Sequence, residues 1–433
     1  MNLSKDIQIG KLLEAGKLIS QQSGFQKALI LKTIAQALES SKDDLIALLV
    51  QEAKKPIKYA RIEVKRCIDT FNIASEEATR IPREYISLNR SLNSNKEGYV
   101  KRFPLGAIFG ITPFNFPLNL VAHKIAPAIA AGCPIIIKPS PKTPLIAKKL
   151  IDIIASCGAE PDAVQCIELP NDQVAEWVKD ERFKLISFTG SAEVGWKLKS
   201  MANKKKVILE LGGNAGAIIA PTANLNHAAK RCTVGGFAYS GQVCIHTQRI
   251  YIHESQFDSF IKIYLNQIAN LTTGKLNEAS TDFGPMISEE AASRVQDWIE
   301  EAKSEGATLL LGGNRMNDFI EPTVMTNTSP AMKIVKEEVF GPVVVVEKYS
   351  QLSDAIDAVN DTAYGLQAGL FTDSNEEIQI AFKQLQVGSI MINDVPTFRD
   401  DNMPYGGIKD SGTGQEGVKY AILEMTEPKL LVT

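Results

Sequence analysis

Hydrophobic positions between residues 10 and 50 recur at helical spacing, with leucine, isoleucine and alanine returning every three or four residues. From about 85 to 103 this helical period is lost, and strand-like stretches lie on both sides of Gly98. The pattern therefore predicts a helical opening that is followed by a β-hairpin or an arm.

Strand and helix patterns then alternate as far as residue 213. Short apolar runs predict buried strands, and most are followed by a segment with helical spacing. In chain order the segments are a strand at 106–112, a helix at 118–132, a strand at 134–140, a helix at 144–158, strands at 163–169 and 184–191, a helix from Ala192, and a strand at 206–213. Such alternation is typical of a mostly parallel, doubly wound sheet.

A second alternating series follows the double glycine at 212–213. Its segments are a strand at 216–220, a helix at 225–240, a strand at 249–253, a helix at 255–271, a strand at 343–349 and a helix at 352–360. A chain of 433 residues exceeds what one hydrophobic core usually serves. We therefore expect an α/β protein with two doubly wound α/β domains.

The composition excludes several classes of protein. Charged residues make up 22% of the chain, and the net charge is −3, with lysine and arginine spread along the sequence. That distribution gives no broad field for binding nucleic acid or an anionic membrane. No uninterrupted apolar stretch approaches the roughly 18 residues of a membrane span, and the first residues lack the pattern of a signal peptide. The simplest interpretation is a cytoplasmic protein.

The six cysteines are scattered without a CxxC pair, and the four histidines share no ligand-like spacing with them. Neither a disulfide framework nor a metal site is predicted. Each cysteine is by default a small buried apolar side chain, so Cys244 in SGQVCIH needs independent support before it is interpreted as a nucleophile.

Two strand ends carry candidate nucleotide-binding residues. FTGSAEVG follows an apolar strand and opens a helix, so Gly190 and Gly195 would let backbone amides approach a phosphate. Its spacing departs from G-x-G-x-x-G, and a tight turn is the alternative interpretation. Lys138 of KPS ends another parallel strand, where open α/β sheets bind ligands, and could donate to a ribose hydroxyl.

A carboxylate and a thiol supply candidate catalytic chemistry. Glu210 stands at a strand end beside two glycines that would let a substrate come close, although a solvated strand-end carboxylate is the alternative. Cys244 follows a predicted helix and a glycine turn, which favours a loop position. Together they are the parts needed for a covalent thioester route with a general base.

Seven motifs occur in the order and with the spacing of one known family. They are TPFNFP (112–117), KPS (138–140), FTGS (188–191), ELGG (210–213), GQVC (241–244), EEVFGP (337–342) and PYGGIKDSG (404–412). With them the chain resembles the aldehyde dehydrogenase superfamily from residue 10 to its end. Members usually carry several dozen further residues before the first helix, so any strand contributed by such a leader is in doubt here.

The resemblance implies a role for each catalytic residue. Cys244 matches the family nucleophile, which attacks the aldehyde as thiolate. The side-chain amide of Asn115 and the backbone N–H of Cys244 would hold the oxyanion. Glu210 matches the family base, which activates the water that hydrolyses the thioester.

The resemblance also implies a nicotinamide cofactor site. Glu338 and Phe340 would hold the nicotinamide ribose and flank the ring, Lys138 would bind the adenosine ribose, and Ser191 would bind the pyrophosphate. The remaining residues assigned to this site are Thr112, Pro113, Ser140, Gly190 and Gly195. NAD is the expected cofactor. NADP is not excluded, because Pro141 and Lys142 follow KPS where many NAD-preferring relatives carry a carboxylate.

The predicted substrate channel contains Phe114 and three residues of a less usual kind. Arg399, His123 and His246 fall near positions that are often apolar or aromatic in relatives. A guanidinium facing a closed channel favours an anionic group at the far end of the substrate. The alternatives are an Arg399 that bridges to a neighbouring aspartate and a His123 satisfied within the core. Asn214, where lysine is common, agrees with the branch that acts on phosphonoacetaldehyde, sulfoacetaldehyde and lactaldehyde.

The implied reaction is NAD(P)-dependent oxidation of a small, anionic aldehyde to its acid through a cysteine thiohemiacetal and thioester. A CoA-acylating semialdehyde dehydrogenase is an alternative, which the presence of Glu210 disfavours. A catalytically silent binding or structural protein on the same scaffold is another, which the presence of all three catalytic residues disfavours. The assay that separates these alternatives is a panel of anionic and neutral aldehydes.

The domain organisation follows from the same resemblance. Residues 1–84 and 104–212 are expected to form the cofactor-binding domain, 213–412 the catalytic domain, and 85–103 with 413–433 an oligomerisation arm and C-terminal strand. Family members pair such a strand with a neighbouring subunit, so a homodimer or homotetramer is expected.

Overall fold

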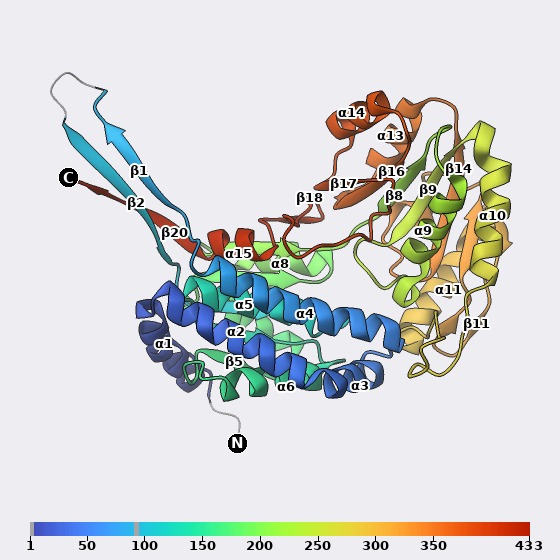
Figure 1. The fold of residues 1–433 in the computed structure, drawn as a ribbon. Helices are drawn as coiled ribbons and strands as arrows, with labels where there is room; N and C mark the ends of the chain where they lie inside the picture. The colour runs from blue at the N-terminus through green and yellow to red at the C-terminus, as the bar shows by residue number, and fades with distance from the viewer. Residues whose placement is uncertain (1–3, 91–94) are drawn as a thin grey trace.

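The computed structural model describes residues 4–90 and 95–433. The chain forms two α/β units and a β arm that projects from the first unit on the side away from the second (Figure 1). Both main sheets have parallel central strands, which confirms the α/β class and the two doubly wound units predicted from the sequence. Residues 91–94 of the predicted arm lie outside the described residues.

Four helices open the chain, and the first three correspond to the helical opening predicted for residues 10–50. Ser4 and Ser23 cap the first two, and Ser23 forms a capping box with Gln26, which satisfies amides that would otherwise be unpaired. The helices are α1 (Lys5–Gln21), α2 (Gly24–Ser40), α3 (Lys42–Glu52) and α4 (Ile57–Glu77).

The first sheet has the strand order β19-β7-β6-β3-β4-β5. Its strands are β3 (Ile108–Ile111), β4 (Ile135–Lys138), β5 (Val164–Cys166), β6 (Leu185–Thr189), β7 (Lys206–Glu210) and β19 (Gly412–Thr413). Its helices are α5 (Asn119–Ala131), α6 (Pro144–Ser156), α7 (Val174–Lys179), α8 (Ala192–Met201) and α15 (Val418–Glu424). The buried α5 ends where Gly132 adopts a left-handed conformation with φ +82°.

The second sheet has the strand order β10-β13-β14-β9-β8-β16-β17. Its strands are β8 (Ala215–Ile219), β9 (Thr247–His253), β10 (Thr308–Leu311), β13 (Thr323–Thr326), β14 (Val343–Tyr349), β16 (Gln367–Phe371) and β17 (Ser389–Ile392). Its helices are α9 (Leu225–Phe237), α10 (Phe257–Ala269), α11 (Glu289–Ser304), α12 (Lys333–Lys336), α13 (Leu352–Asn360) and α14 (Asn375–Gln384).

Short pairings complete the second unit and the link to the first. They are β11 (Arg315–Met316) with β12 (Phe319–Ile320), and β15 (Tyr364–Gly365) with β18 (Ile408–Lys409). Near its end the chain returns to the first sheet, where β19 pairs antiparallel with β7 beside Glu210.

The arm is a three-stranded antiparallel sheet that contains the predicted hairpin and C-terminal strand. Its order is β1-β2-β20, with β1 (Arg83–Leu88), β2 (Lys96–Pro104) and β20 (Thr426–Val432). Within this chain β20 pairs with β2 over its whole length, so β20 is an edge strand. Its side chains Leu430 and Leu431 are exposed.

One predicted helix is shorter than the sequence suggested. The helical spacing predicted a helix through Tyr239 and Ser240, but α9 ends at Phe237. Tyr239 and Ser240 adopt left-handed conformations, with φ of 48° and 54°, and Gly241 continues the turn with φ 69°. The chain therefore turns sharply just before Cys244.

Candidate active site

A cavity of approximately 390 Å³ collects residues from both α/β units. Most of the predicted site residues line it, although they are spread over almost 300 positions of the sequence. Those residues are Pro113, Phe114, Asn115, His123, Gly190, Ser191, Glu210, Cys244, Glu338, Phe340 and Arg399. The strand ends and loops of the two sheets thus bring the predicted thiol, amide, carboxyl and guanidinium groups into one cavity.

Asn115 is held in place by a buried ion pair. The fully buried Lys55 and Glu63 form a short salt bridge, and the Lys55 ammonium also donates to the Asn115 carbonyl oxygen at 2.6 Å. The Glu63 carboxylate accepts from the backbone amides of Leu118 and Asn119 at 2.9 and 3.2 Å. The loop after β3 is therefore fixed from both sides by one pair of opposite charges.

The Asn115 side chain faces the loop that carries Cys244. Its Nδ2 donates to the Gln242 carbonyl oxygen at 3.0 Å. A side-chain amide has two N–H groups, so a second donor remains for a ligand in the cavity.

The Cys244 loop is anchored at several points. The Tyr239 hydroxyl donates to the Ala53 carbonyl oxygen, and the Ser240 hydroxyl donates to that of Gly284, each at 2.5 Å. The Gln242 side-chain oxygen accepts from the Ile287 amide at 2.9 Å. These contacts offset the cost of the consecutive left-handed residues. Strained loops of this kind are frequent at functional sites.

The Cys244 thiol is partly buried in an environment that disfavours its ionised form. Burial raises its pKa to about 12, and the carboxyl groups of Glu338 and Glu210 act in the same direction. The Tyr405 hydroxyl lies 3.1 Å from the sulfur and acts in the opposite direction. The Cys244 thiol is thus neither a fully enclosed core cysteine nor a freely solvated one.

Glu210 is a buried carboxyl group without a partner. Neither of its oxygens has a hydrogen bond to the described residues. Burial and the neighbouring Glu416 carboxylate raise the pKa of Glu210 well above its ordinary value. Glu416 itself is held ionised, because the Lys124 ammonium at 2.8 Å overcomes burial and lowers the pKa of Glu416. A protonatable carboxyl facing a cavity is suited to general base chemistry.

The double glycine of ELGG lets three segments meet. A side chain at Gly212 would place its Cβ 2.3 Å from the Glu338 carboxylate, and one at Gly213 would place it 2.2 Å from the Cys244 carbonyl oxygen. Glu338 instead accepts from the Gly213 amide at 3.0 Å. Burial raises the pKa of Glu338 to about 7 despite this hydrogen bond.

The start of α8 offers a possible phosphate position. Ser191 occupies the N-cap of α8, and its side chain makes no capping hydrogen bond. Its hydroxyl and the helix N-terminus thus both face the cavity region. Gly190 and Gly195 also have a packing role, because a Cβ there would clash with the Phe188 ring at 2.5 Å and with Leu211 at 2.4 Å.

Four predicted cofactor residues do not line this cavity. Thr112 and Lys138 stand at the carboxyl ends of β3 and β4, where Lys138 donates to the Asn171 side chain at 2.7 Å. The Ser140 hydroxyl accepts from the Lys142 amide at 3.2 Å. Gly195 packs against Leu211, as described above. Their assignment to the cofactor stays a prediction.

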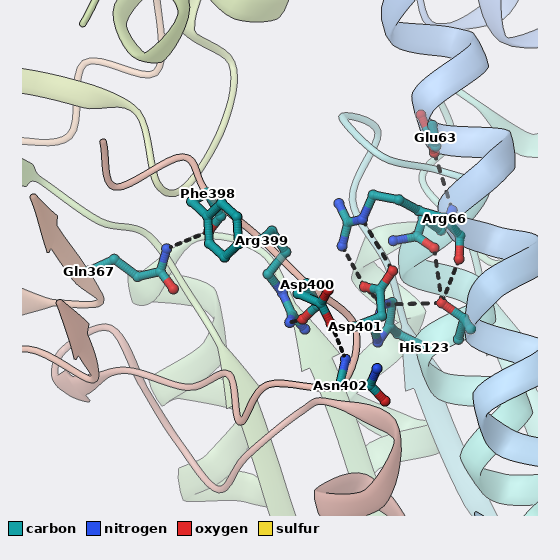
Figure 2. A network of polar contacts seen from close by, with 11 residues as sticks. Glu63, Arg66, His123, Gln367, Phe398, Arg399, Asp400, Asp401 and Asn402 are labelled. Atoms are coloured by element: carbon teal, nitrogen blue, oxygen red, sulfur yellow. Dashed lines mark hydrogen bonds and ion pairs between the residues drawn. The ribbon is translucent and has the colours of Figure 1, made fainter. Parts of the chain in front are cut away.

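Two residues that line the cavity belong to a network of polar contacts around Asp401 (Figure 2). Arg66 of α4 and His123 of α5 converge on Asp401, with contacts of 2.7 Å from each to the same carboxylate oxygen. Burial would raise the pKa of Asp401, but His123 and Arg66 outweigh it and hold that pKa well below its ordinary range. Burial lowers the pKa of His123. Both Arg66 and His123 line the cavity.

Arg399 lies in the same segment as Asp401. Its Nη1 donates to the backbone carbonyl of Asp400, and its guanidinium lies 4.2 Å from the Tyr405 ring centroid. In the described part of the chain it forms no salt bridge with the Asp400 or Asp401 carboxylate. The structure therefore does not show the alternative interpretation, in which Arg399 forms a salt bridge with a neighbouring aspartate. N–H groups of the Arg399 guanidinium are available to a ligand.

His246 does not reach the cavity. Its ring is buried, its Nε2 lies 2.9 Å from the Gly236 carbonyl oxygen, and burial lowers its pKa to about 4. His246 is only two residues after Cys244 in the sequence, but its side chain does not line the cavity, because the chain enters β9 directly after it. The predicted substrate role of His246 is not supported.

Sequence reasoning missed several residues of the site. Arg66, Tyr405 and Glu416 line the cavity, and Lys55 and Glu63 lie beneath it. The PYGG motif was the one local signal for Tyr405. Arg66 carried no signal, since an arginine on an amphipathic helix normally faces solvent.

Comparisons with known proteins agree with this site. The chain matches the aldehyde dehydrogenase family over residues 9–431. A 3-sulfolactaldehyde dehydrogenase from Priestia aryabhattai is 39% identical over 412 residues, which cover 95% of this chain and 86% of that protein. Among solved structures, aldehyde dehydrogenase 21 from Physcomitrella patens, in complex with the reaction product succinate, has a TM-score of 0.98 at 42% identity and covers 100% and 91% of the two chains.

A glyceraldehyde-3-phosphate dehydrogenase from Methanocaldococcus jannaschii, complexed with NADP, has a TM-score of 0.95 at 36% identity, covering 99% and 93% of the two chains. This chain belongs to the aldehyde dehydrogenase family. It is an NAD(P)-dependent oxidoreductase, and the predicted family and branch are confirmed. Among the described residues, no helix has both the length and the apolar character needed to cross a membrane.

Replacing Glu63 with glutamine is expected to destabilise the protein by about 3–5 kcal/mol, because the change leaves a buried ammonium without its carboxylate. Urea denaturation followed by tryptophan fluorescence measures the shift. The control is Glu39→Gln, which removes an exposed salt bridge to Lys42 and should shift the denaturation midpoint far less, because water and salt screen an exposed pair. Equal shifts in the two variants would contradict the structural importance of the buried pair.

Proposed function

We propose that this enzyme oxidises a small aldehyde with an anionic tail to its carboxylic acid, with Cys244 as the nucleophile. The observation that carries the proposal is the composition of one cavity. It holds a thiol, a buried carboxyl group without a partner in the described residues, an amide donor and three guanidinium groups, of which that of Arg294 donates to the Val339 carbonyl oxygen. That set supplies a nucleophile, a base, an oxyanion donor and an anion anchor.

The residues of the cavity fit a nicotinamide cofactor. Ser191 and Glu338 line the cavity, and in the described residues the Ser191 side chain makes no capping hydrogen bond at the start of α8. The buried Thr112 hydroxyl, which lies outside the cavity after β3, has no partner in the described residues either. Ser191 would bind the pyrophosphate and Glu338 a ribose hydroxyl. When bound, the nicotinamide ring supplies the hydride acceptor for the oxidation.

The chain's own groups perform the remaining steps. The Cys244 thiolate forms a bond to the aldehyde carbon, and the carbonyl oxygen becomes an oxyanion. The free N–H of the Asn115 amide and the backbone N–H of Cys244 donate to that oxyanion, and one such donor typically contributes about 10²–10³ in rate. Loss of hydride from the same carbon restores the carbonyl as a thioester on Cys244.

Glu210 would act in the second half of the reaction. Its carboxylate removes a proton from water, the resulting hydroxide adds to the thioester carbon, and the carbon–sulfur bond breaks to release the acid and the thiolate. Because burial and Glu416 raise the pKa of Glu210, its basic form becomes more abundant as pH rises. Turnover that is limited by hydrolysis should therefore increase with pH.

The anionic tail is inferred from the charged groups shown in Figure 2. The guanidinium groups of Arg66 and Arg399 both line the cavity, and in the described residues Arg66 pairs with Asp401 whereas Arg399 forms no salt bridge. An anion on the substrate would bind the Arg399 guanidinium through charge-assisted hydrogen bonds. A relative named for 3-sulfolactaldehyde and a moss enzyme that holds succinate both act on molecules with an anionic group.

NAD is the proposed cofactor, and NADP is also compatible. Residues 139–143, which follow Lys138 at the end of β4, contain no carboxylate that would repel a 2′-phosphate. Activity assays with NAD and with NADP therefore decide which cofactor the enzyme prefers.

Replacing Glu210 with glutamine is expected to leave an initial burst of reduced cofactor, equal in amount to the enzyme, and to slow steady turnover at least 10²-fold. Stopped-flow absorbance measures both phases. Cys244→Ala is the control and should abolish both. If added CoA restored fast turnover to Glu210→Gln, the acyl group would be passing to CoA, and if burst and turnover fell together, Glu210 would not be the hydrolytic base.

Replacing Arg66 or Arg399 with methionine is expected to lower kcat/KM for succinic semialdehyde by about 10- to 150-fold, because hydrogen bonds to charged groups contribute about 1.5–3 kcal/mol. Butanal, which has the same chain length without the charge, should be affected less than threefold. Arg61→Met is the matched control, since Arg61 lies exposed on the same helix, α4. Equal losses for both aldehydes would remove these arginines as the anion anchor.

The arm supports a proposed homodimer or homotetramer. Its edge strand β20 exposes Leu430 and Leu431, which are 49% and 62% accessible. An exposed apolar edge strand is a template for pairing with another chain. Leu431→Asp is therefore expected to shift the protein toward monomer in light scattering after size-exclusion chromatography. Leu18→Asp, at a similarly exposed leucine of α1, should not do so, and a monomeric wild-type protein would refute the proposal.

A further inference from the structure

The side chain in hydrogen-bonding contact with the candidate nucleophile is a tyrosine. The Tyr405 hydroxyl lies 3.1 Å from the Cys244 sulfur, within the distance of a hydrogen bond to sulfur. In the described part of the chain this is the one hydrogen bond that the hydroxyl makes. Tyr405 lies 161 positions after Cys244, so its placement is a product of the fold.

Tyr405 is held rigidly at this position. Its backbone amide donates to the Glu416 carbonyl oxygen at 3.0 Å, and the Glu416 amide donates back at 2.6 Å. Its ring is buried in a small apolar cluster with Val243, Ile245 and Leu366. Because the backbone and the ring are both fixed, the hydroxyl is directed at the sulfur in the absence of any ligand.

At neutral pH the phenol can donate a hydrogen bond to the sulfur. Burial raises the pKa of Tyr405 well above its ordinary value, so its proton is retained. The Arg399 guanidinium, 4.2 Å from the ring centroid, adds positive charge over the ring. A nearby cation draws electron density from the phenol and makes its O–H a stronger donor to an anion.

Other groups around the sulfur oppose its ionisation. The carboxyl groups of Glu210 and Glu338 approach the sulfur from the ends of two other segments, and burial removes water. No lysine, arginine or histidine forms a hydrogen bond to the Cys244 sulfur in the described residues. A nucleophilic thiol normally depends on such a cation or on a donor to hold its thiolate.

We propose that Tyr405 is a further catalytic residue, whose O–H donates a hydrogen bond to the Cys244 thiolate. The inference rests on the proposed function in taking Cys244 as the nucleophile. The thiol proton passes to water, and the phenol keeps its own proton throughout. The same hydrogen bond stabilises the thiolate before it attacks the aldehyde and when it leaves at the end of thioester hydrolysis.

The test measures the reactivity of the thiol without any aldehyde. Cys244 in wild-type enzyme and in Tyr405→Phe is alkylated with iodoacetamide between pH 7 and 10, and the modified peptide is followed by mass spectrometry to separate it from the other five cysteines. A hydrogen bond to a charged group corresponds to a roughly 10- to 100-fold change in the thiolate fraction. Tyr405→Phe is therefore expected to react about 10- to 100-fold more slowly at each pH.

Two further measurements distinguish this role from a structural one. Tyr405→Phe at a pH about one to two units higher should be alkylated as fast as wild type at the original pH, since the lost stabilisation is that of the charged thiolate. Tyr264→Phe is the control, because this buried hydroxyl has no partner in the described residues and lies in the core of the second unit. It should alkylate at the wild-type rate.

An alkylation rate in Tyr405→Phe equal to that of wild type would overturn the proposal, whatever happens to its melting temperature. A loss of rate that higher pH does not restore would also overturn it, because it would show altered access rather than altered ionisation. A failure of the proposed function itself would be seen in a different experiment. In that case Cys244→Ala would still oxidise the aldehyde.

Discussion

The buried salt bridge between Lys55 and Glu63 is the constraint on which the active site depends. It joins the start of α4 to the loop after β3, and the Lys55 ammonium lies 4.0 and 4.4 Å from the ring centroids of Phe116 and Tyr239. Removing two charges from water is costly unless each is fully hydrogen-bonded. Here those hydrogen bonds go to the backbone of the loop that carries Asn115, so the requirements of the ion pair fix the geometry of the oxyanion donor.

The same cavity combines groups whose ordinary charge states are suppressed by burial. The carboxyl groups of Glu210 and Glu338 and the thiol of Cys244 all have raised pKa values. Each is poised to change its protonation state when a ligand alters the local dielectric and charge. The guanidinium groups of Arg66 and Arg399 line the same cavity, and they are the groups that would bind the anionic tail of the proposed aldehyde.

Much of the fold could be predicted because buried parallel strands appear as continuous apolar runs, as β4 and β14 do. The residues proposed for catalysis could be named in advance because they stand in the motifs TPFNFP, ELGG and GQVC. The left-handed turn at Tyr239 could not be predicted from the sequence, since only contacts with distant segments such as Ala53 hold a tyrosine in that conformation. The place of Arg66 in the site could not be predicted either, because its partner Asp401 is 335 positions away. His246 was misplaced because closeness in sequence was taken for closeness in space.

The segment from Arg399 to Glu416 lines part of the cavity, and a ribosome makes it after most of the groups that it meets there. It supplies the guanidinium, the phenol next to the sulfur and the carboxylate beside Glu210. Both sheets have nearly all of their strands before this segment emerges. A nascent chain can therefore build most of its scaffold while the phenol is still missing from beside the thiol, and the cavity is complete only after residue 416 has been made.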